Sequence, residues 1–431
     1  MSAHACARPD NDIPDRPDRL LLLVPTTSYR IADFLDAAHR LGVDVAVGSD
    51  QRSVLEQFSD GGTTTVDFRS ADHGLAQILD YHAEYPLGAI IGVDQETTLS
   101  AAKASQALGL RHNAPAAVEA AGNKHRFRSR LANSGLPAPW FSLLSLADGP
   151  AAHAGDMPYP VVLKPLALSA SRGVIRADNP TQFIAAMNRI KEILSAADGP
   201  DETAHHVLVE DYIPGREVAL EGLLEGGDLT VLALFDKPDP LEGPYFEETI
   251  YVTPSRLPVS VQADITSTVS RAVQTLGLRE GPIHAELRIN DDGAWLLEVA
   301  ARSIGGLCSR ALEFGDGGRL EDLIIRHAMN LPVEPHKPDE PHEPEQPASG
   351  VMMIPIPGDG VLRRVDGLAA ARAAPGIRDA LISLPLGDTL IPLPDGNRYL
   401  GFIFAGGETP LAVEAALRAA HGKLDFLIEA D

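Results

Sequence analysis

The feature that most constrains the fold is an apolar strand followed by a helix and a second strand. Arg19–Pro25 (RLLLLVP) predicts the first strand, a helical stretch runs to Leu41, and Val43–Val47 predicts the second strand. A third strand is expected at Gly88–Val93, and another helix follows it. Three such units predict an open parallel sheet over residues 18–113, whose ligand edge lies at the carboxyl ends of the strands.

The loops at that edge give two interpretations. Because no Gly-x-Gly-x-x-Gly pattern follows the first strand, a dinucleotide site is not favoured. Asp94 and Glu96 come directly after the third strand, where a substrate could bind. Acidic residues in such loops are more often solvated helix caps, so both interpretations stay open.

Length and composition exclude several classes of protein. The chain has 431 residues, more than a single core usually holds, so we expect two to four packed units. Residues 1–17 are rich in proline and charge and lack the order of a signal peptide, which predicts a disordered lead. No window approaches the roughly 20 apolar residues of a membrane span. We therefore expect a cytoplasmic protein without membrane contact.

Charge and cysteine content argue against a nucleic-acid partner and against cysteine-based sites. The net charge of −24 argues against a nucleic acid, although a local group of cations would still suit ATP. Cys6 and Cys308 are too few and too far apart for a disulfide framework or a cysteine-ligated zinc site.

The middle of the chain, residues 114–331, alternates strands, helices and hairpins as in an α+β unit. One hairpin is predicted from Glu217–Leu223 and Thr230–Phe235. A second is predicted from Pro282–Asn290 and Ala294–Ala300, because a turn sequence joins them.

Two further segments follow. Residues 332–349 are rich in Pro, Glu and His, which predicts a linker or long loop. His336 and His342 suggest a metal site there, but the surrounding charges favour a solvated linker. Residues 350–431 predict a last small unit, in which a Thr-Pro pair begins the final helix.

Residues suited to ATP occur in order along the middle unit. Lys164 ends an apolar strand, and the loop Ser169–Gly173 follows it with small side chains and backbone N–H groups for phosphate oxygens. Each signal is weak alone, but together they suit a triphosphate. The strand end at Glu210–Ile213 is either a sheet edge or the reader of an adenine edge, and Glu217 is placed to take ribose hydroxyls.

Two carboxylates point to a metal. Glu286 and Glu298 are expected on neighbouring antiparallel strands with their side chains on one face. Like charges that close destabilise a sheet unless a cation lies between them, and hard oxygen ligands favour Mg²⁺. Lys237 supplies a further cation.

The order and spacing of these motifs resemble the ATP-grasp superfamily, and within it the L-amino acid ligases. The similarity runs from about Leu20 to the C-terminus, where Tyr399–Lys423 resembles the closing domain of those ligases. The motifs that carry it are Lys124, Lys164, Ser169–Gly173, Val209–Ile213, Gly215–Glu217, Lys237, His284–Glu286 and Glu298–Arg302.

The resemblance implies an ATP-grasp fold, with an N-terminal parallel-sheet domain and a small C-terminal domain in a mixed α/β and α+β architecture. It also implies a mobile lid over residues 155–213. The implied cofactors are ATP and Mg²⁺, with Mn²⁺ as an alternative. The nucleotide is assigned to Lys124, Lys164, Ser169, Ser171, Gly173, Glu210, Tyr212, Ile213, Glu217 and Lys237.

The remaining implied roles concern metal, substrate and catalysis. Glu286 and Glu298 are assigned to the metal, while Lys237 and Arg302 are the catalytic cations. The substrate is assigned to Glu248, Tyr251, Arg302 and Gly306. The sequence departs from the family pattern at two of its positions: Ala300 replaces a common Asn near the second metal glutamate, and Tyr251 stands where comparable ligases carry His.

The activity that follows is ADP-forming ligation of a carboxylate, expected to be that of an amino acid, to an amine through an acyl phosphate. An ATP-grasp carboxylase acting on bicarbonate and a non-catalytic ATP-binding protein are the alternatives. The resemblance further suggests small-molecule partners and a homodimer.

Overall fold

The N-terminal part is a parallel sheet sandwiched between helices. The computed structural model describes residues 19–54, 56, 59–196, 202–315, 317–332 and 347–430, so the predicted lead and most of the predicted linker lie outside the described residues. The first elements are β1 (Arg19–Leu23), α1 (Ile31–Leu41), β2 (Asp44–Ser49), β3 (Thr63–Thr65), α2 (Ala71–Glu84), β4 (Ala89–Gly92) and α3 (Gln95–Ala107). The strands pair in parallel in the order β3-β2-β1-β4, which confirms the predicted sheet and adds the short β3.

The alternation of β1 side chains explains why this sheet is buried on both faces. Leu20 and Leu22 pack against α1 and against α8 (Leu320–Ala328), whereas Leu21 and Leu23 pack against α2 and α3. All four leucines are buried, as the continuous apolar run of a parallel strand requires.

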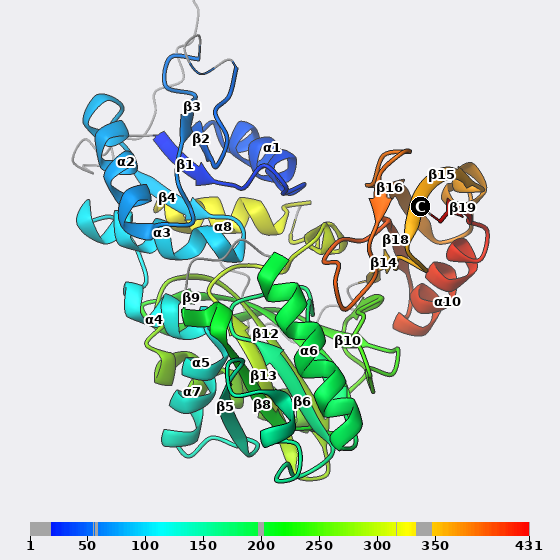
Figure 1. The fold of residues 1–431 in the computed structure, drawn as a ribbon. Helices are drawn as coiled ribbons and strands as arrows, with labels where there is room; N and C mark the ends of the chain where they lie inside the picture. The colour runs from blue at the N-terminus through cyan, green and yellow to red at the C-terminus, as the bar shows by residue number, and fades with distance from the viewer. Residues whose placement is uncertain are drawn as a thin grey trace, which may run out of the picture.

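The body of the molecule is built on an eight-stranded antiparallel sheet (Figure 1). Its first five strands in order, β13-β12-β9-β10-β11, include both predicted hairpins. Helices α4, α5 and α7 pack on one face of this part through a shared apolar core. The bounds are α4 (Pro115–Gly122), α5 (Lys124–Asn133), β9 (Arg216–Glu225), β10 (Asp228–Lys237), β11 (Ile250–Thr253), α7 (Val259–Leu276), β12 (Gly281–Asn290) and β13 (Gly293–Ala300).

A smaller antiparallel sheet covers part of the body. Its order is β5-β8-β6-β7, and α6 packs on it through residues such as Phe183 and Ile190. The predicted lid, residues 155–213, includes all of these elements except β5, which pairs with β8. The bounds are β5 (Phe141–Ser145), β6 (Val161–Pro165), β7 (Ile175–Ala177), α6 (Pro180–Ala196) and β8 (His206–Asp211).

The C-terminal segment continues the central sheet instead of forming a sheet wholly its own. Strand β14 pairs antiparallel with β11, and β18 and β16 follow it in the same sheet. Only β17-β15-β19 form a separate small sheet. The bounds are β14 (Ala348–Ile354), β15 (Gly360–Asp366), α9 (Leu368–Arg372), β16 (Ile377–Ile382), β17 (Thr389–Leu390), β18 (Gly401–Gly407), α10 (Pro410–His421) and β19 (Asp425–Glu429).

Predicted capping is present at the final helix. The Thr409 hydroxyl accepts a hydrogen bond from the Ala412 N–H, and Pro410 occupies the first turn of α10. None of the helices in the described ranges combines the length and the apolar character that crossing a bilayer requires.

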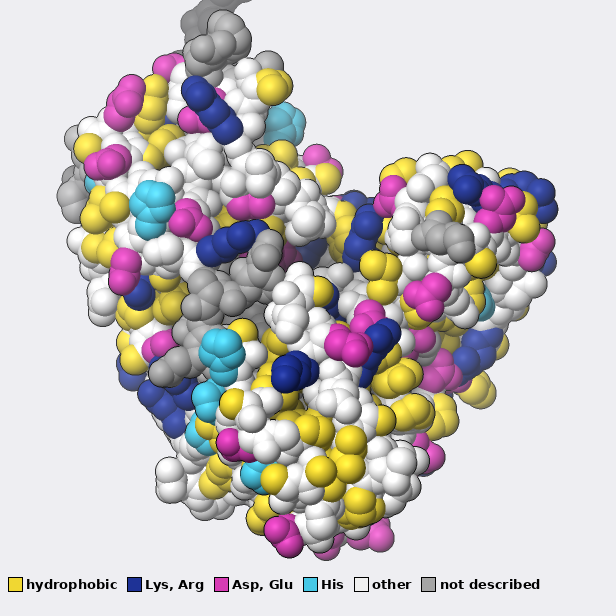
Figure 2. Space-filling model, viewed as in Figure 1, with side chains coloured by type: hydrophobic (Ala, Val, Ile, Leu, Met, Phe, Trp, Pro, Cys, Tyr) yellow, Lys and Arg dark blue, Asp and Glu magenta, His cyan; other side chains and the backbone are white. Residues whose placement is uncertain are grey.

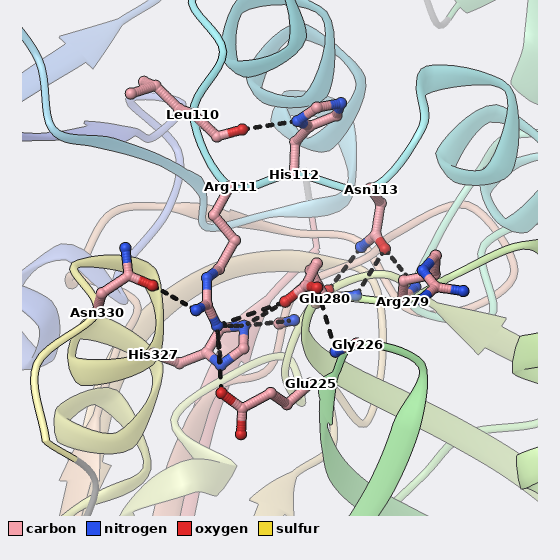
Figure 3. A network of polar contacts seen from close by, with 11 residues as sticks. Leu110, Arg111, His112, Asn113, Glu225, Gly226, Arg279, Glu280, His327 and Asn330 are labelled. Carbon is pink, nitrogen blue, oxygen red and sulfur yellow. Dashed lines mark hydrogen bonds and ion pairs between the residues drawn. The ribbon is translucent and has the colours of Figure 1, made fainter.

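The parts meet around a notch, which Figure 2 shows between the N-terminal portion at the upper left and the C-terminal portion at the right. A polar joint fastens the N-terminal part to the body (Figure 3). Arg111 contacts Glu280 and the ring of buried His327, and the Asn113 Oδ1 accepts hydrogen bonds from the backbone N–H groups of Arg279 and Glu280. These contacts join segments more than 160 residues apart in the chain.

A close backbone approach at Gly367 generates a prediction about stability. Gly367 has φ +83°, and a Cβ atom there would collide with the carbonyl oxygen of Lys423. Gly42 also has positive φ, +66°, but open space surrounds its Cβ position. We expect Gly42→Ala to cost about 1–2 kcal/mol of stability through its backbone conformation alone. Gly367→Ala should cost about 1–3 kcal/mol more because of the collision.

Urea unfolding followed by circular dichroism measures the two costs. Hydrogen exchange should accelerate in β15 and β19 in Gly367→Ala only. Gly367 directly follows β15, and Lys423, whose carbonyl oxygen the new Cβ would meet, lies just before β19. Equal destabilisation by the two substitutions would show that the close approach is not the cause.

Candidate active site

The predicted site residues converge on one cavity of about 570 Å³. It is lined from the N-terminal sheet, the lid, the central sheet and the C-terminal segment. The predicted residues on its wall are Lys124, Lys164, Ser169, Ser171, Glu210, Tyr212, Ile213, Glu217, Glu248, Tyr251, Glu286, Glu298, Arg302 and Gly306. Asp94 and Glu96, left open above, also line it. Lys237 lies behind the wall, and Gly173 lies outside the lining.

Two lysines stand at the lid end of the cavity. The ammonium of Lys124, at the start of α5, donates a hydrogen bond to the Leu168 carbonyl at 2.7 Å, and burial lowers the pKa of Lys124. Lys164, on β6, forms an ion pair with Glu210. Both positive charges therefore lie next to the loop that begins at Ser169, as a triphosphate site requires.

Glu210 is held by an arginine that sequence reasoning did not single out. Arg128 donates to Glu210 at 2.9 Å, and both side chains are buried. Burial opposes ionisation of Glu210, but Arg128 and Lys164 outweigh it and lower its pKa. The only sequence signal for Arg128 was its place in a basic helix. Its partner is 82 residues away.

The phosphate loop itself is a tight turn. Ala170 and Ser171 have positive φ, +53° and +54°, which bends the backbone between Ser169 and Gly173. Gly173 differs from its predicted role in one respect, because its N–H donates to the Pro394 carbonyl at 2.8 Å. In this structure that N–H is therefore engaged by the C-terminal segment.

The region expected for adenine is apolar and edged by arginines. Val162, Leu241 and Phe246 form a small buried cluster with Tyr212 packed against it. The Arg288 guanidinium lies 5.0 Å from the Tyr212 ring centroid. Such a wall suits a flat aromatic base.

Arg288 also engages residues that the sequence assigned to the nucleotide. It donates to Glu217 at 3.0 Å and to the Ile213 carbonyl at 2.8 Å. Strand alternation is a signal for this residue, since Arg288 follows Glu286 by two positions on β12 and so shares its face.

A buried cluster of acids surrounds Lys237. The ammonium of Lys237 is 2.8 Å from Glu217 and 3.3 Å from Glu286, and it also pairs with Glu248. Burial opposes its charge, but these carboxylates raise the pKa of Lys237 well above its ordinary value. The charge that the sequence assigned to terminal phosphates is thus compensated by three carboxylates in this structure.

The two predicted metal ligands face each other. Glu286 and Glu298 are direct cross-strand partners in the β12–β13 hairpin. Burial opposes ionisation of Glu286, yet Lys237 and His284 hold its pKa well below its ordinary value. Glu298 lies 3.8 Å from Lys124. Carboxylate oxygen donors on adjacent strands fit a hard divalent cation.

Glu248 belongs to the cluster of acids around Lys237. Single oxygens of Glu217, Glu248 and Glu286 all lie within 4.8 Å of one another. Burial and the charge of Glu286 raise the pKa of Glu248 to about 7. Tyr251 donates to Glu248 at 2.8 Å, so this predicted substrate pair is connected directly to the acids.

Arg302 and several aromatic residues also line the cavity or pack behind its wall. Arg302 donates to the Ser303 carbonyl at 2.8 Å and makes no ion pair with any described residue. Tyr29 and Tyr399, which sequence reasoning missed, pack edge-on against Phe402 at ring-centroid distances of 5.6 and 6.1 Å. They come from the two ends of the chain, so no local pattern connects them.

Gly306 is constrained both by its backbone conformation and by its neighbours. It lines the cavity, and its φ of +63° is one that side chains rarely adopt. A Cβ atom there would lie 3.1 Å from Phe402 and 3.4 Å from Cys308. Both a turn and a lack of bulk at the pocket therefore depend on this glycine.

Comparisons with known proteins agree with this arrangement. Residues 157–311 match the ATP-grasp domain, residues 35–112 the ATP-grasp N-terminal domain, and residues 352–429 the L-amino acid ligase C-terminal domain 2. Alanine–anticapsin ligase of Bacillus subtilis is 27% identical over 219 residues, which cover 47% of this chain and 46% of that protein. Dapdiamide A synthase of Enterobacter agglomerans is 28% identical over 159 residues, covering 36% and 35%.

The same fold is seen in a solved structure. The L-amino acid ligase from Bacillus licheniformis superposes with a TM-score of 0.78 at 24% identity, covering 96% of this chain and 100% of that one. The match with the alanine–anticapsin ligases spans about half of their length. The chain therefore contains parts that match an ATP-grasp N-terminal domain, an ATP-grasp domain and an L-amino acid ligase C-terminal domain.

Proposed function

We propose that the protein is an ADP-forming ligase that joins a carboxylate, expected to be that of an amino acid, to an amine. The observation that carries this proposal is the meeting in one cavity of Lys124, Lys164, the cross-strand pair Glu286 and Glu298, and Arg302, which forms no ion pair with a described residue. A site that only bound ATP would not need, in addition to the lysines and the acids, an arginine that no described carboxylate pairs with. The names of the similar ligases support the same class of reaction.

The residues divide the reaction between them. Lys124, Lys164 and the N–H groups of the Ser169 loop would neutralise and position the phosphates. Glu286 and Glu298 would hold Mg²⁺, or Mn²⁺, which when bound offsets charge on the transferring phosphoryl group. Ala300 offers no ligand, so this chain supplies the metal with two carboxylates from the hairpin.

The carboxylate substrate would receive the phosphoryl group on one oxygen, giving an acyl phosphate and ADP. Arg302 is placed to bind the substrate carboxylate and then the oxyanion that forms when the amine nitrogen adds to the acyl carbon. Phosphate leaves as the amide forms. Lys237 acts here through the acids, because it fixes Glu217, Glu248 and Glu286 rather than facing the cavity.

The two alternatives have less support. A carboxylase that acts on bicarbonate would not need the part of the cavity lined by Tyr29, Tyr251, Tyr399 and Gly306. A non-catalytic ATP-binding protein would not need the cross-strand pair Glu286 and Glu298 in the same cavity as Arg302. A homodimer and a cytoplasmic location remain predictions from the sequence.

The metal assignment predicts the effect of two near-isosteric substitutions. Glu286→Gln and Glu298→Gln should each lower amine-dependent ADP release at least about 100-fold, because loss of a direct ligand should exceed the 10–100-fold typical of second-shell changes. Release is measured with pooled amino acids and Mg²⁺, and circular dichroism checks the fold.

Glu225→Gln is the matched control, since Glu225 is an exposed residue at the end of β9 and lies outside the cavity lining. It should turn over like the wild type. Near wild-type rates in both Glu286→Gln and Glu298→Gln would refute the metal assignment. ADP release with bicarbonate alone, but not with amino acids, would favour the carboxylase.

The aromatic end of the cavity predicts substrate preference. Tyr251 is buried and its hydroxyl faces Glu248, while the hydroxyls of Tyr29 and Tyr399 have no hydrogen-bond partner among the described residues. We expect an apolar or aromatic first substrate to be preferred over an acidic one. Tyr399→Ala should widen this pocket and raise the ratio of kcat/KM for bulky over small amino acids about 10-fold or more.

The measurement is ADP release over a panel of single amino acids and pairs. Tyr245→Ala is the control, because Tyr245 is exposed and does not line the cavity. The tyrosine is a better test site than Gly306, where Gly306→Trp would strain the backbone. An unchanged profile in Tyr399→Ala would show that this wall does not select the side chain.

A further inference from the structure

The loop between β17 and β18 is hydrogen-bonded to the lid. The Pro394 carbonyl accepts a hydrogen bond from the Gly173 N–H at 2.8 Å, and the Asp395 carbonyl accepts one from the Arg172 Nε at 2.7 Å. The carboxylate of Asp395 accepts two more from Arg189, at 2.5 and 3.1 Å. Four hydrogen bonds thus connect two segments that lie more than 200 residues apart.

On the lid, two of these contacts are made by the phosphate loop itself, through Arg172 and Gly173. Arg172 and Gly173 follow Ser169 and Ser171, which line the cavity, while Arg189 lies on α6. Because α6 packs on the sheet that carries Lys164, a contact that fixes Arg189 also restricts the movement of the lid.

On the C-terminal side, the same loop continues into the cavity wall. Asn397, Arg398 and Tyr399 follow Asp395 and line the cavity. The loop then enters β18, which pairs with β14 of the central sheet. A bend in which the Gly396 N–H donates to the Pro392 carbonyl at 2.9 Å fixes the loop's shape. These hydrogen bonds therefore connect the lid to a loop that is itself continuous with the central sheet.

We propose that Arg172, Arg189 and Asp395 are positioning residues that latch the lid to this loop, so that closure over the nucleotide and completion of the substrate pocket occur together. The proposal rests on the ligase function proposed above. None of the three side chains needs to touch a reacting atom. They act by holding Ser169 and Ser171 on one side and Tyr399 on the other.

The strength of the latch suits a reversible closure. The Arg189 and Asp395 side chains are 49% and 28% exposed, so their ion pair is weak and is screened by salt. The two contacts made by the loop's carbonyl groups do not depend on the carboxylate. Removal of one side chain should therefore loosen the closed lid without preventing closure.

A loosened lid should separate ATP use from ligation. Once the acyl phosphate has formed, water that enters the cavity can replace the amine as nucleophile, and the products are then the original carboxylate and phosphate. ADP has already been made, but no amide bond results. The number of ADP molecules released per amide is thus a readout that loss of fold alone does not raise.

The first experiment measures this ratio with the amino-acid pair that gives the wild type its fastest ADP release. We expect about one ADP per amide in the wild type and a ratio about two- to fivefold higher in Asp395→Ala and in Arg189→Ala. The double variant should be no worse than either single variant, because both remove the same contact. Glu192→Gln is the matched control, since Glu192 also binds Arg189, at 3.0 Å, but does not reach the loop.

The second experiment does not depend on amide formation. The dissociation rate of a fluorescent, non-hydrolysable ATP analogue with Mg²⁺ should rise about two- to fivefold in Asp395→Ala and in wild type at high salt. The charge-swapped pair, Arg189→Asp with Asp395→Arg, should restore the slow rate if the ion pair is what matters.

The outcomes separate the two proposals. Wild-type dissociation rates in folded Asp395→Ala and Arg189→Ala would overturn the latch, whatever the ADP ratio. If the wild type forms no amide with any amine tested but the dissociation rates change as expected, the ligase proposal fails and the latch stands. Faster dissociation in Glu192→Gln equal to that in Asp395→Ala would also overturn the latch, because charge near Arg189 would then be sufficient.

Discussion

The buried ammonium of Lys237 is the interaction on which the site depends. Carboxyl groups that share a buried space need a nearby cation, and Lys237 forms ion pairs with Glu217, Glu248 and Glu286. Removing such a partner would leave buried charges uncompensated, at a cost on the order of 3–5 kcal/mol. The arrangement thus keeps acids available on adjacent strands, close to where a divalent cation and phosphates would add their own charges.

The central sheet turns this local arrangement into a cavity. Strands β9 and β12 carry Glu217 and Glu286, β10 carries Lys237, and β11 continues the sheet into β14 of the C-terminal segment. The same hydrogen-bonded sheet therefore carries the proposed metal ligands and the strand that follows Tyr399. The N-terminal sheet closes a further side, where the buried Arg30 donates to Ser303 at 2.6 Å. The cavity is a junction of segments rather than a pocket inside one of them.

Local chemistry explains which parts were predictable. Strand alternation predicts a shared face for Glu286 and Glu298, but regular pairing from the short turn would put Glu286 opposite Leu297. The register shift between Glu286 and Leu287, which no local pattern predicts, places it opposite Glu298. The apolar run of β1 and the units after it likewise predict a parallel sheet without knowledge of its partners. The lid loop could be recognised because glycine and serine follow a strand that ends in lysine. The order of these motifs, through their resemblance to the ATP-grasp superfamily, added the roles that no single motif implies.

The sequence by itself determined most of the elements, the ordered set of cations and acids, and the resemblance to the ATP-grasp superfamily. Only the tertiary structure decided which of those charges meet. Arg128 finds Glu210 across 82 residues, Arg288 finds Glu217 across 71, and Arg189 finds Asp395 across 206. Strand and helix periodicities describe neighbours within a few residues, whereas these pairs arise from sheet order and from the packing of one segment on another. For that reason the sequence pointed to Lys237 as a phosphate cation, while the fold surrounds it with carboxylates.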